Sequence, residues 1–241
     1  MPLFNQLSSL LKICRSAVLN ALFPISCLNC RKPKIFLCSN CLKQIQITNK
    51  IIHSTSTLHD LTNPELPGFR GIIAACDYHQ SKILKKAIQL FKYKRIKKIG
   101  ETLGKLMQKR IKQFLRQNNK PWIIVPLPLH RRKMLARGFN QNDILARACF
   151  TNLKFNITLL LNKQNPLKRV KYTGTQTKLT GLKRIANVQK VFAIIDAKAV
   201  ANKNIIIIDD IATTGATLKE AAQTLLKAGA GQVWGFVLAR D

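Results

Sequence analysis

The chain has 241 residues, of which 46% are hydrophobic and 21% are charged. This share of apolar residues is enough to build a folded core, so a wholly disordered chain is excluded. Lysine and arginine number 41 against 10 acidic residues, which gives a formal net charge of +31 at pH 7. A polyanionic partner is therefore expected, and nucleic acid, an acidic membrane surface and a phosphorylated ligand all fit this charge.

The cysteine count and the first segment bear on the cellular compartment. Seven cysteines, an odd number, argue against the fully paired disulfide framework of a secreted protein, and we expect a cytoplasmic protein with reduced thiols. Residues 1–23 carry apolar side chains at helical spacing, which predicts an amphipathic helix. Polar residues such as Lys12 and Arg15 interrupt it, so no transmembrane segment is expected. The helix would pack on the protein or lie on a membrane surface, which adds a peripheral membrane position as an alternative.

Residues 24–45 contain two C-x2-C pairs. The first pair is Cys27 and Cys30, the second is Cys38 and Cys41, and seven residues separate the pairs. Each pair can direct two thiolates at one ion, and four sulfur ligands in a tetrahedron are typical of structural zinc. The segment is too short to bury a core of its own, so the ion would supply folding free energy. We predict a structural Zn²⁺ at these four cysteines.

The rest of the chain changes character near residue 70. Residues 46–69 are polar with little periodicity and are predicted to be a linker. Strands are predicted at 72–75, 122–126, 191–193, 204–208 and 232–239. Helices are predicted at 81–90, 97–115, 140–149 and 218–228. Continuous apolar strands that alternate with helices indicate a mainly parallel sheet flanked by helices, so residues 70–241 are expected to form one α/β domain.

The most informative motif follows the predicted strand 204–208. Two acidic residues come directly after the strand, and a Thr/Gly turn then leads into the next helix. Unpaired N–H groups at a helix start, with nearby hydroxyls, suit a phosphate, while the carboxylates can accept hydrogen bonds from sugar hydroxyls. This segment resembles the motif of type I phosphoribosyltransferases that binds 5-phosphoribosyl 1-pyrophosphate (PRPP), a ligand taken with Mg²⁺. The residues assigned to PRPP are Asp209, Asp210, Ala212, Thr213, Thr214, Gly215, Ala216 and Thr217.

Two other interpretations of this motif compete with PRPP binding. A strand that ends in two aspartates is also found in P-loop nucleotidases, but no complete G-x4-G-K-[ST] sequence occurs. Residues 100–105 come nearest and are one residue too short. The acids could alternatively cap the following helix without binding a ligand.

Two more segments suit the pyrophosphate group. The strand predicted at 122–126 leads into a loop with three consecutive cations, Arg131, Arg132 and Lys133. Residues 169–187 are polar and contain glycine, as is typical of a mobile loop that closes over a phosphate ligand. The residues assigned to the pyrophosphate and to this loop are His130, Arg131, Arg132, Arg169, Gln176, Arg184 and Asn187.

Taken together, these motifs resemble the ComF family of competence proteins from about residue 20 to the C-terminus. The resemblance is carried by the four cysteines and by the segments 90–94, 125–141, 169–187 and 209–217. It implies a zinc-ribbon-like N-terminal module, a phosphoribosyltransferase-like domain and a part in natural transformation, with DNA-uptake machinery at the inner membrane face as a partner. The sequence departs from the family's pattern at two positions: Arg31 stands where glycine is common, and Lys183 stands where an acidic residue is common.

The charge pattern agrees with single-stranded DNA as a partner. Residues 81–120 hold 14 lysines or arginines and one acid, Glu101, with aromatic residues between them. Cations neutralise phosphates, and exposed aromatic rings stack on unpaired bases. The residues assigned to DNA are Lys92, Tyr93, Lys94, Arg95, Lys97 and Lys98.

The sequence identifies no acceptor for a phosphoribosyl group and no catalytic residue. A competence protein that binds PRPP and DNA is our first interpretation. A nucleobase-salvage phosphoribosyltransferase and a non-catalytic PRPP sensor are the alternatives, because fold alone does not establish turnover.

Overall fold

The computed structural model describes residues 25–49, 51–53, 66–172 and 190–241. The chain divides into two compact units, Met1–Gln44 and Ile45–Asp241. The helix predicted at 1–23 and the candidate site residues Gln176, Arg184 and Asn187 lie outside the described residues. Among the described helices, none is long and apolar enough to cross a membrane.

The described part of the first unit is a pair of tight turns followed by α2 (Ser39–Lys43). In the first turn the N–H of Cys27 donates to the carbonyl of Lys32, and the N–H of Arg31 donates back to the carbonyl of Cys27. Arg31 adopts a φ of 61°, in the left-handed region that favours glycine. This backbone conformation explains why glycine is common at this position.

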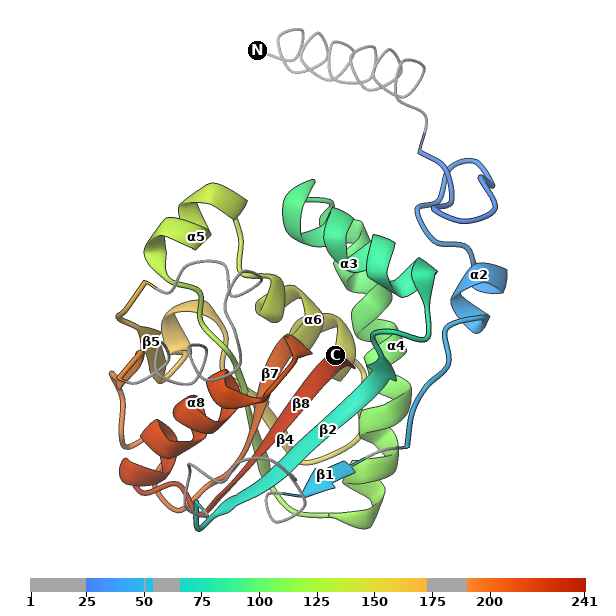
Figure 1. Cartoon of the computed structure of the whole chain (residues 1–241). Coiled ribbons are helices and arrows are strands. Elements are labelled where there is room, and N and C mark those ends of the chain that lie inside the picture. Colours follow the sequence, from blue (N-terminus) through green and yellow to red (C-terminus); the bar gives the residue numbers. More distant parts are fainter. Residues whose placement is uncertain (1–24, 50, 54–65, 173–189) are drawn as a thin grey trace, which may run out of the picture. The chain divides into compact units, whose positions relative to one another are not determined.

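The second unit is built on a six-stranded sheet in the order β1-β2-β8-β7-β3-β4 (Figure 1). The strands span β1 (Ile51–His53), β2 (Phe69–Asp77), β8 (Gln232–Arg240), β7 (Asn204–Ala212), β3 (Trp122–Pro126) and β4 (Ile157–Leu159). All neighbours pair in parallel except β1, which is antiparallel to β2. The mainly parallel sheet is as predicted, and the middle of β7 is the continuous apolar run Ile205–Ile208 because both faces of the sheet are covered.

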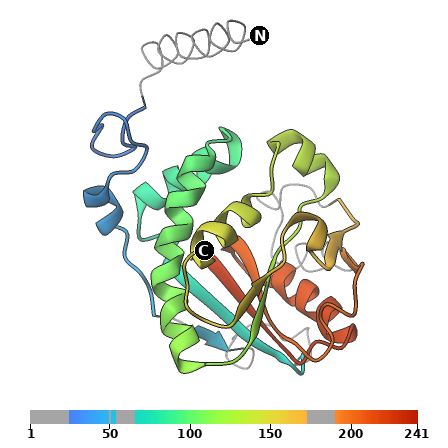
Figure 2. The ribbon, with the colours of Figure 1, turned by 180° about the vertical axis from the view of Figure 1, so that it is seen from behind.

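Helices cover both faces of the sheet. Figure 1 shows α8 (Ala216–Lys227) in front of the sheet, and Figure 2 shows α4 (Lys97–Gln117) and α6 (Gln141–Phe150) on the opposite face. Helix α3 (Lys82–Tyr93) begins at Ser81, whose side chain accepts a hydrogen bond from the N–H of Leu84, and packs against α4. The result is a three-layer α/β arrangement.

The glycines of α4 have a packing role. A Cβ on Gly104 would lie 2.6 Å from the Cβ of Ala148 in α6, and one on Gly100 would lie 2.3 Å from the ring of Phe91 in α3. Both glycines therefore allow helices to approach closely. The sequence 100–105, which is similar to part of a P-loop, is helix interior here.

Three expectations need correction. Within the segment predicted as a linker, Ile51–His53 forms β1 and pairs with β2, so these residues belong to the sheet. The loop expected to present cations after β3 contains the helix α5 (Arg131–Arg137). Strand β7 runs on to Ala212, so the acidic pair lies inside the strand and not after it. The remaining described elements are a 3-10 turn (Asn162–Gln164) and the antiparallel pair β5 (Leu167–Arg169) and β6 (Phe192–Ile194).

Candidate functional site

The acidic pair lies where β7 extends beyond its neighbour β3. The pairing of β3 with β7 ends at Pro126 and Ile208, whereas β8 stays paired with β7 as far as Ala212. Asp209 and Asp210 therefore lie in a part of β7 that pairs with β8 along one edge. The other edge of this part, beyond the end of β3, faces the loop after β3. This position, at the carboxyl end of parallel strands, is where α/β sheets bind ligands.

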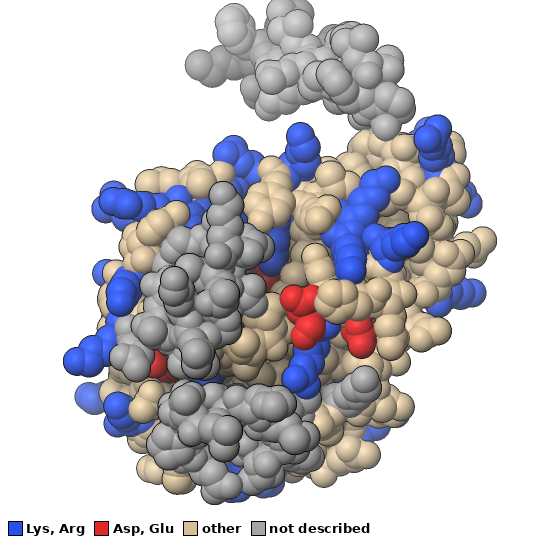
Figure 3. All heavy atoms as spheres, in the orientation of Figure 1, with Lys and Arg blue, Asp and Glu red and all other residues tan. Residues whose placement is uncertain are grey.

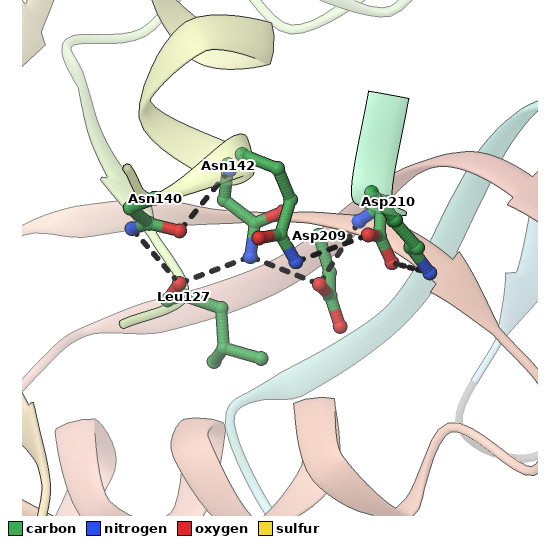
Figure 4. A network of polar contacts seen from close by, with 7 residues as sticks. Leu127, Asn140, Asn142, Asp209 and Asp210 are labelled. Carbon is green, nitrogen blue, oxygen red and sulfur yellow. Dashed lines mark hydrogen bonds and ion pairs between the residues drawn. The ribbon is translucent and has the colours of Figure 1, made fainter. Parts of the chain in front are cut away.

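Each aspartate is held by a different residue at the start of α6 (Figure 4). The amide nitrogen of Asn142 donates to Asp209 Oδ1 at 3.0 Å, and the backbone N–H of Asp210 donates to the same oxygen at 2.9 Å. Gln141 Nε2 donates to Asp210 Oδ2 at 3.1 Å, and Lys92 Nζ lies 2.9 Å from Asp210 Oδ1. Both oxygens of Asp210 are thus occupied, and this residue is only 5% exposed.

The start of α6 is fixed by the loop after β3. Asn140 caps the helix, because its side-chain oxygen accepts from the N–H of Asn142 at 3.2 Å. The amide nitrogens of Asn140 and Asn142 both donate to the carbonyl of Leu127, at 3.3 and 3.0 Å. Asn142 therefore links the loop after β3 to Asp209 of β7, which sets the spacing between the two strands' ends.

Two buried acceptors at this place have no hydrogen-bond partner in the described structure, Gln141 Oε1 and Asn142 Oδ1. The amide nitrogens of both side chains donate to carboxylates, which fixes the orientation of the amides. A buried carbonyl without a donor costs about 1–3 kcal/mol. A ligand hydroxyl or a hydrated cation would satisfy these oxygens, so they mark a site that accepts donors.

The charge state of Asp209 is sensitive to its surroundings. Burial, together with the neighbouring charge of Asp210, raises the pKa of Asp209 to about 6, against the effect of its hydrogen bonds and of Lys92. Ionisation of this carboxyl group is costly, so a ligand that brings hydrogen-bond donors or a divalent cation would stabilise the ionised form.

A group of cations surrounds the acidic pair. Burial, followed by the charges of Arg169, Arg137 and Lys92, lowers the pKa of Lys133 to about 8, while Asp209 acts in the opposite direction. Burial likewise lowers the pKa of Arg169, and Asp209 again opposes the shift. Lys133 therefore lies near three other cations and Asp209, and such a concentration of positive charge suits a multiply charged anion.

The turn between β7 and α8 has the features of a phosphate loop. Gly215 adopts a φ of 75° directly before α8, and the hydroxyl of Thr214 accepts from the N–H of Ala216 at 3.3 Å. A Cβ on Gly215 would lie 2.7 Å from Ile72 Cδ1, so only glycine fits without a shift. The first turn of α8 carries no acidic side chain, which leaves the positive end of the helix dipole for a ligand.

The structure changes the roles assigned to several cations. Lys92, which we expected to contact DNA, has its side chain 17% exposed and is paired with Asp210. Arg131 and Arg132 are exposed on α5, whereas Lys133 is half-buried and interacts with Asp209. His130 accepts a hydrogen bond from the N–H of Arg132 and so caps α5.

The other residues assigned to DNA are exposed. Tyr93 is 63% exposed, and Lys94 and Lys98 are also exposed. Arg95 donates to the carbonyl of Ala136 in α5, and Lys97 lies 5.5 Å from the centre of the Phe139 ring.

Sequence reasoning missed the residues that hold the acidic pair. Gln141 and Asn142 carry no charge and stand far from Asp209 and Asp210 in the chain, so no local pattern assigns them to the site. The signal available was the segment Arg137–Gln141, which carried part of the family resemblance. The packing of α6 against β7 brings them to the acidic pair.

The four cysteines form a separate candidate metal site in the first unit. The sulfur atoms of Cys27, Cys30, Cys38 and Cys41 all lie within 4.8 Å of one another. Burial opposes ionisation of the Cys27 thiol, but N–H groups of Cys38, Asn29 and Cys30 outweigh it and lower the pKa of Cys27 to about 6. Four converging sulfurs with N–H donors fit a tetrahedral Zn²⁺, as expected from the spacing.

Comparisons with known proteins agree with this picture. The model of the phosphoribosyl transferase domain matches residues 160–240. Competence protein F of Haemophilus influenzae is 30% identical over 90% of this chain and 98% of its own length. DNA utilization protein YhgH of Escherichia coli is 30% identical over 70% of this chain and 72% of its own. Competence protein ComFC of Bacillus subtilis is 35% identical over 51% of this chain and 46% of its own.

Among solved structures, a hypoxanthine phosphoribosyltransferase from Trypanosoma cruzi aligns with 59% of this chain and 76% of its own, at 13% identity and a TM-score of 0.37. The family model covers β5 to β8, and with them the acidic pair and the turn before α8. The domain match and the mainly parallel sheet flanked by helices show the type I phosphoribosyltransferase fold that the sequence predicted.

Proposed function

Because the chain belongs to the ComF family, we propose that it is a competence protein of natural transformation that binds PRPP with Mg²⁺. Two of the relatives are named as competence proteins and one as a DNA utilization protein, which supports a role in the handling of imported DNA. We place this role at the cytoplasmic side of the inner membrane, next to the DNA-uptake machinery.

The observation that carries the PRPP proposal is the cation group around Asp209, next to two buried acceptors without partners. PRPP combines what these groups require: hydroxyls for the carboxylate and the amide oxygens, a 5-phosphate for the turn Thr213–Thr217, and a pyrophosphate for Lys133 and Arg169. Mg²⁺ prefers oxygen ligands and partial hydration, and Asp209 with the oxygens of Gln141 and Asn142 offers such a set. The cation would offset the charge of the pyrophosphate.

The two aspartates take different parts in this proposal. Asp210 is saturated by Lys92 and Gln141 and anchors β7 to α3 and α6. The hydrogen bonds from Asn142 and from the N–H of Asp210 both end on Oδ1 of Asp209, so Asp209 is the residue whose Oδ2 would contact the ribose or the cation. This division refines the sequence-based assignment, which gave both residues the same role.

Ligand-induced stabilisation tests the proposal. PRPP with Mg²⁺ should raise the melting temperature of the full chain, because a ligand at a hundred times its Kd adds about 2.7 kcal/mol of stability. Asp209→Asn should remove this shift, whereas Glu101→Gln, which removes one exposed carboxylate from α4, should keep it. A full shift in Asp209→Asn, or none in the wild type, would reject the PRPP site. Release of pyrophosphate with an added nucleobase would mark a salvage transferase, and binding without release a PRPP sensor.

We also propose that the basic surface binds single-stranded DNA. Figure 3 shows lysine and arginine side chains spread over the face seen there, with few acidic side chains among them. Tyr93 is well exposed, and Lys94 and Lys98, which lie close to it in the sequence, are exposed as well, as a stacking residue and phosphate contacts would be. Affinity for a thymidine oligonucleotide should fall with salt at a log–log slope of about −0.7 for each neutralised phosphate. A flat salt response would count against DNA binding.

A further inference from the structure

Helix α5 is an exposed element beside the candidate site. None of its seven residues is buried, and two of its apolar side chains, Met134 and Leu135, are 37% and 72% exposed. In Figures 1 and 2 the helix stands beyond the carboxyl end of the sheet, across from α3. A helix whose apolar side chains are exposed contributes little to the packing of the core. Core packing therefore does not account for these side chains, and contact with a partner does.

The helix adjoins an exposed aromatic ring surrounded by cations. Tyr172 follows β5 and is 45% exposed. Its ring centre lies 5.4 Å from the guanidinium carbon of Arg132, 5.8 Å from Lys133 Nζ and 5.3 Å from the centre of the His130 ring. The cations orient the ring and place positive charge around a flat surface that solvent can reach.

This chemistry fits a single-stranded nucleic acid better than a lipid surface. Unpaired bases stack on exposed tyrosine rings and on guanidinium planes, while neighbouring lysines and arginines neutralise the phosphates. Membrane insertion scales with the apolar area that is buried, and α5 exposes only two large apolar side chains among four cations, Arg131, Arg132, Lys133 and Arg137.

We propose that α5 and Tyr172 form a contact surface for single-stranded DNA, in which a base stacks on Tyr172 and phosphates lie against Arg131 and Arg132. The inference rests on the proposed DNA binding and assigns it to a surface that the sequence had given to the pyrophosphate. Arg95, in the connection between α3 and α4, donates to the carbonyl of Ala136 in α5, so this surface continues into the one that carries Tyr93. Lys133 borders both the DNA surface and the acidic pair.

Binding of a labelled thymidine oligonucleotide by fluorescence anisotropy tests the proposal on the full chain. The double variant Arg131→Gln with Arg132→Gln should raise Kd about tenfold and lower the salt slope by about 1.4, because each lost phosphate contact removes about 0.7. Tyr172→Ala should raise Kd by about fivefold or more, and Tyr172→Phe should restore most of the affinity, because stacking needs the ring and not the hydroxyl. The matched control is Lys203→Gln with Lys227→Gln, two exposed lysines at the amino end of β7 and the end of α8.

Photocrosslinking identifies the contact directly. An oligonucleotide with 5-iododeoxyuridine should crosslink to Tyr172 in the wild type. If the wild type binds DNA but the Tyr172 and arginine variants bind as tightly as the control, the proposed surface is wrong and the DNA proposal stands. If the wild type does not bind DNA at all, the DNA proposal itself fails. If the same variants lose binding to vesicles of phosphatidylglycerol but keep DNA affinity, α5 is a membrane contact and the inference is overturned.

Discussion

Lys92 at the end of α3 forms an ion pair with Asp210 of β7, with 2.9 Å between Nζ and Oδ1. Both side chains are shielded from water, at 17% and 7% exposure. The ion pair joins α3 to β7, the strand that carries the site. Gln141 of α6 donates a hydrogen bond to the other oxygen of Asp210, so a third element is held to the same carboxylate. Asp210 thus works as an anchor that sets the position of Asp209.

Removal of the lysine should destabilise the fold. Lys92→Met leaves the buried carboxylate of Asp210 without its counter-ion, and the loss of one partner of a buried pair costs about 3–5 kcal/mol of unfolding free energy. Chemical denaturation checks this value, with Lys94→Met, an exposed neighbour, as the control. Combination with Asp210→Asn should recover part of the loss, because the stranded charge is then absent. Equal stability of Lys92→Met and Lys94→Met would contradict the anchoring role.

Alanine substitutions at two glycines with nearly the same φ distinguish the cost of backbone strain from the cost of a steric contact. Gly215→Ala and Gly138→Ala both place an alanine at a positive φ, at 75° and 77°. Each should lose about 1–2 kcal/mol for the left-handed conformation. At Gly215 the new Cβ also meets Ile72, whereas nothing lies within 4 Å at Gly138. Gly215→Ala should therefore be the less stable of the two and should alone weaken the PRPP-induced thermal shift. Equal losses of stability and of ligand response would show that the turn tolerates the Cβ.

The raised pKa of Asp209 predicts a pH dependence. Its pKa is about 6 in the folded protein and 3.8 by reference, so between these values the folded state holds more protons than the unfolded state. The unfolding free energy therefore falls as pH rises through this window, and above pH 6 the full penalty is present. Asp209→Asn should be more stable than the wild type at pH 7, by about 1 kcal/mol or more, and should lose this advantage below about pH 4.

The same titration affects ligand binding in the opposite sense. A protonated Asp209 cannot bind a cation, so the affinity for PRPP with Mg²⁺ should fall as pH drops below about 6. Melting curves from pH 4 to 8, with and without ligand, measure both effects. Asp143→Asn is the matched control, because burial also raises the pKa of Asp143 to about 6. A pH profile of Asp209→Asn parallel to that of the wild type would refute the assignment.

The cysteine module should contain about one Zn²⁺ per chain. Cys41→Ser should lower the zinc content measured by elemental mass spectrometry, whereas Cys149→Ala, a buried cysteine outside the cluster, should leave it unchanged. A chelator should release the metal and expose the thiols of the module to reagents. Full zinc content in Cys41→Ser would mean that the metal is held elsewhere.

Arg31 offers a test of backbone strain in the same module. Arg31→Gly should relieve the left-handed conformation at φ 61° and stabilise the metal-bound turn by about 1 kcal/mol, which corresponds to slower zinc loss to a chelator by about fivefold. Arg31→Ala, which keeps the strain and removes the charge, is the control. Equal release rates for the two variants would attribute any change to charge and not to conformation.

Local patterns were sufficient for much of this protein. The apolar run Ile205–Ile208 predicted a buried strand, the Thr/Gly turn predicted a helix start, and the spacing of four cysteines predicted that their sulfurs converge. These features depend on a few consecutive residues, whose propensities and spacing are fixed by covalent geometry. The alternation of strands and helices along the chain predicted a mainly parallel sheet flanked by helices. The type I phosphoribosyltransferase fold was implied by the resemblance of residues 209–217 to a PRPP-binding motif.

Only the tertiary structure decided which polar side chains meet. Lys92 belongs to a basic stretch in the sequence. Its ion pair with Asp210 forms because α3 lies near β7 in the folded domain. Among the three cations after β3, the formation of α5 turns Lys133 toward Asp209 and leaves Arg131 and Arg132 exposed. A buried charge must be paired, and its partner comes from the element that packs against it. The residues next to it in the sequence do not indicate which element that is.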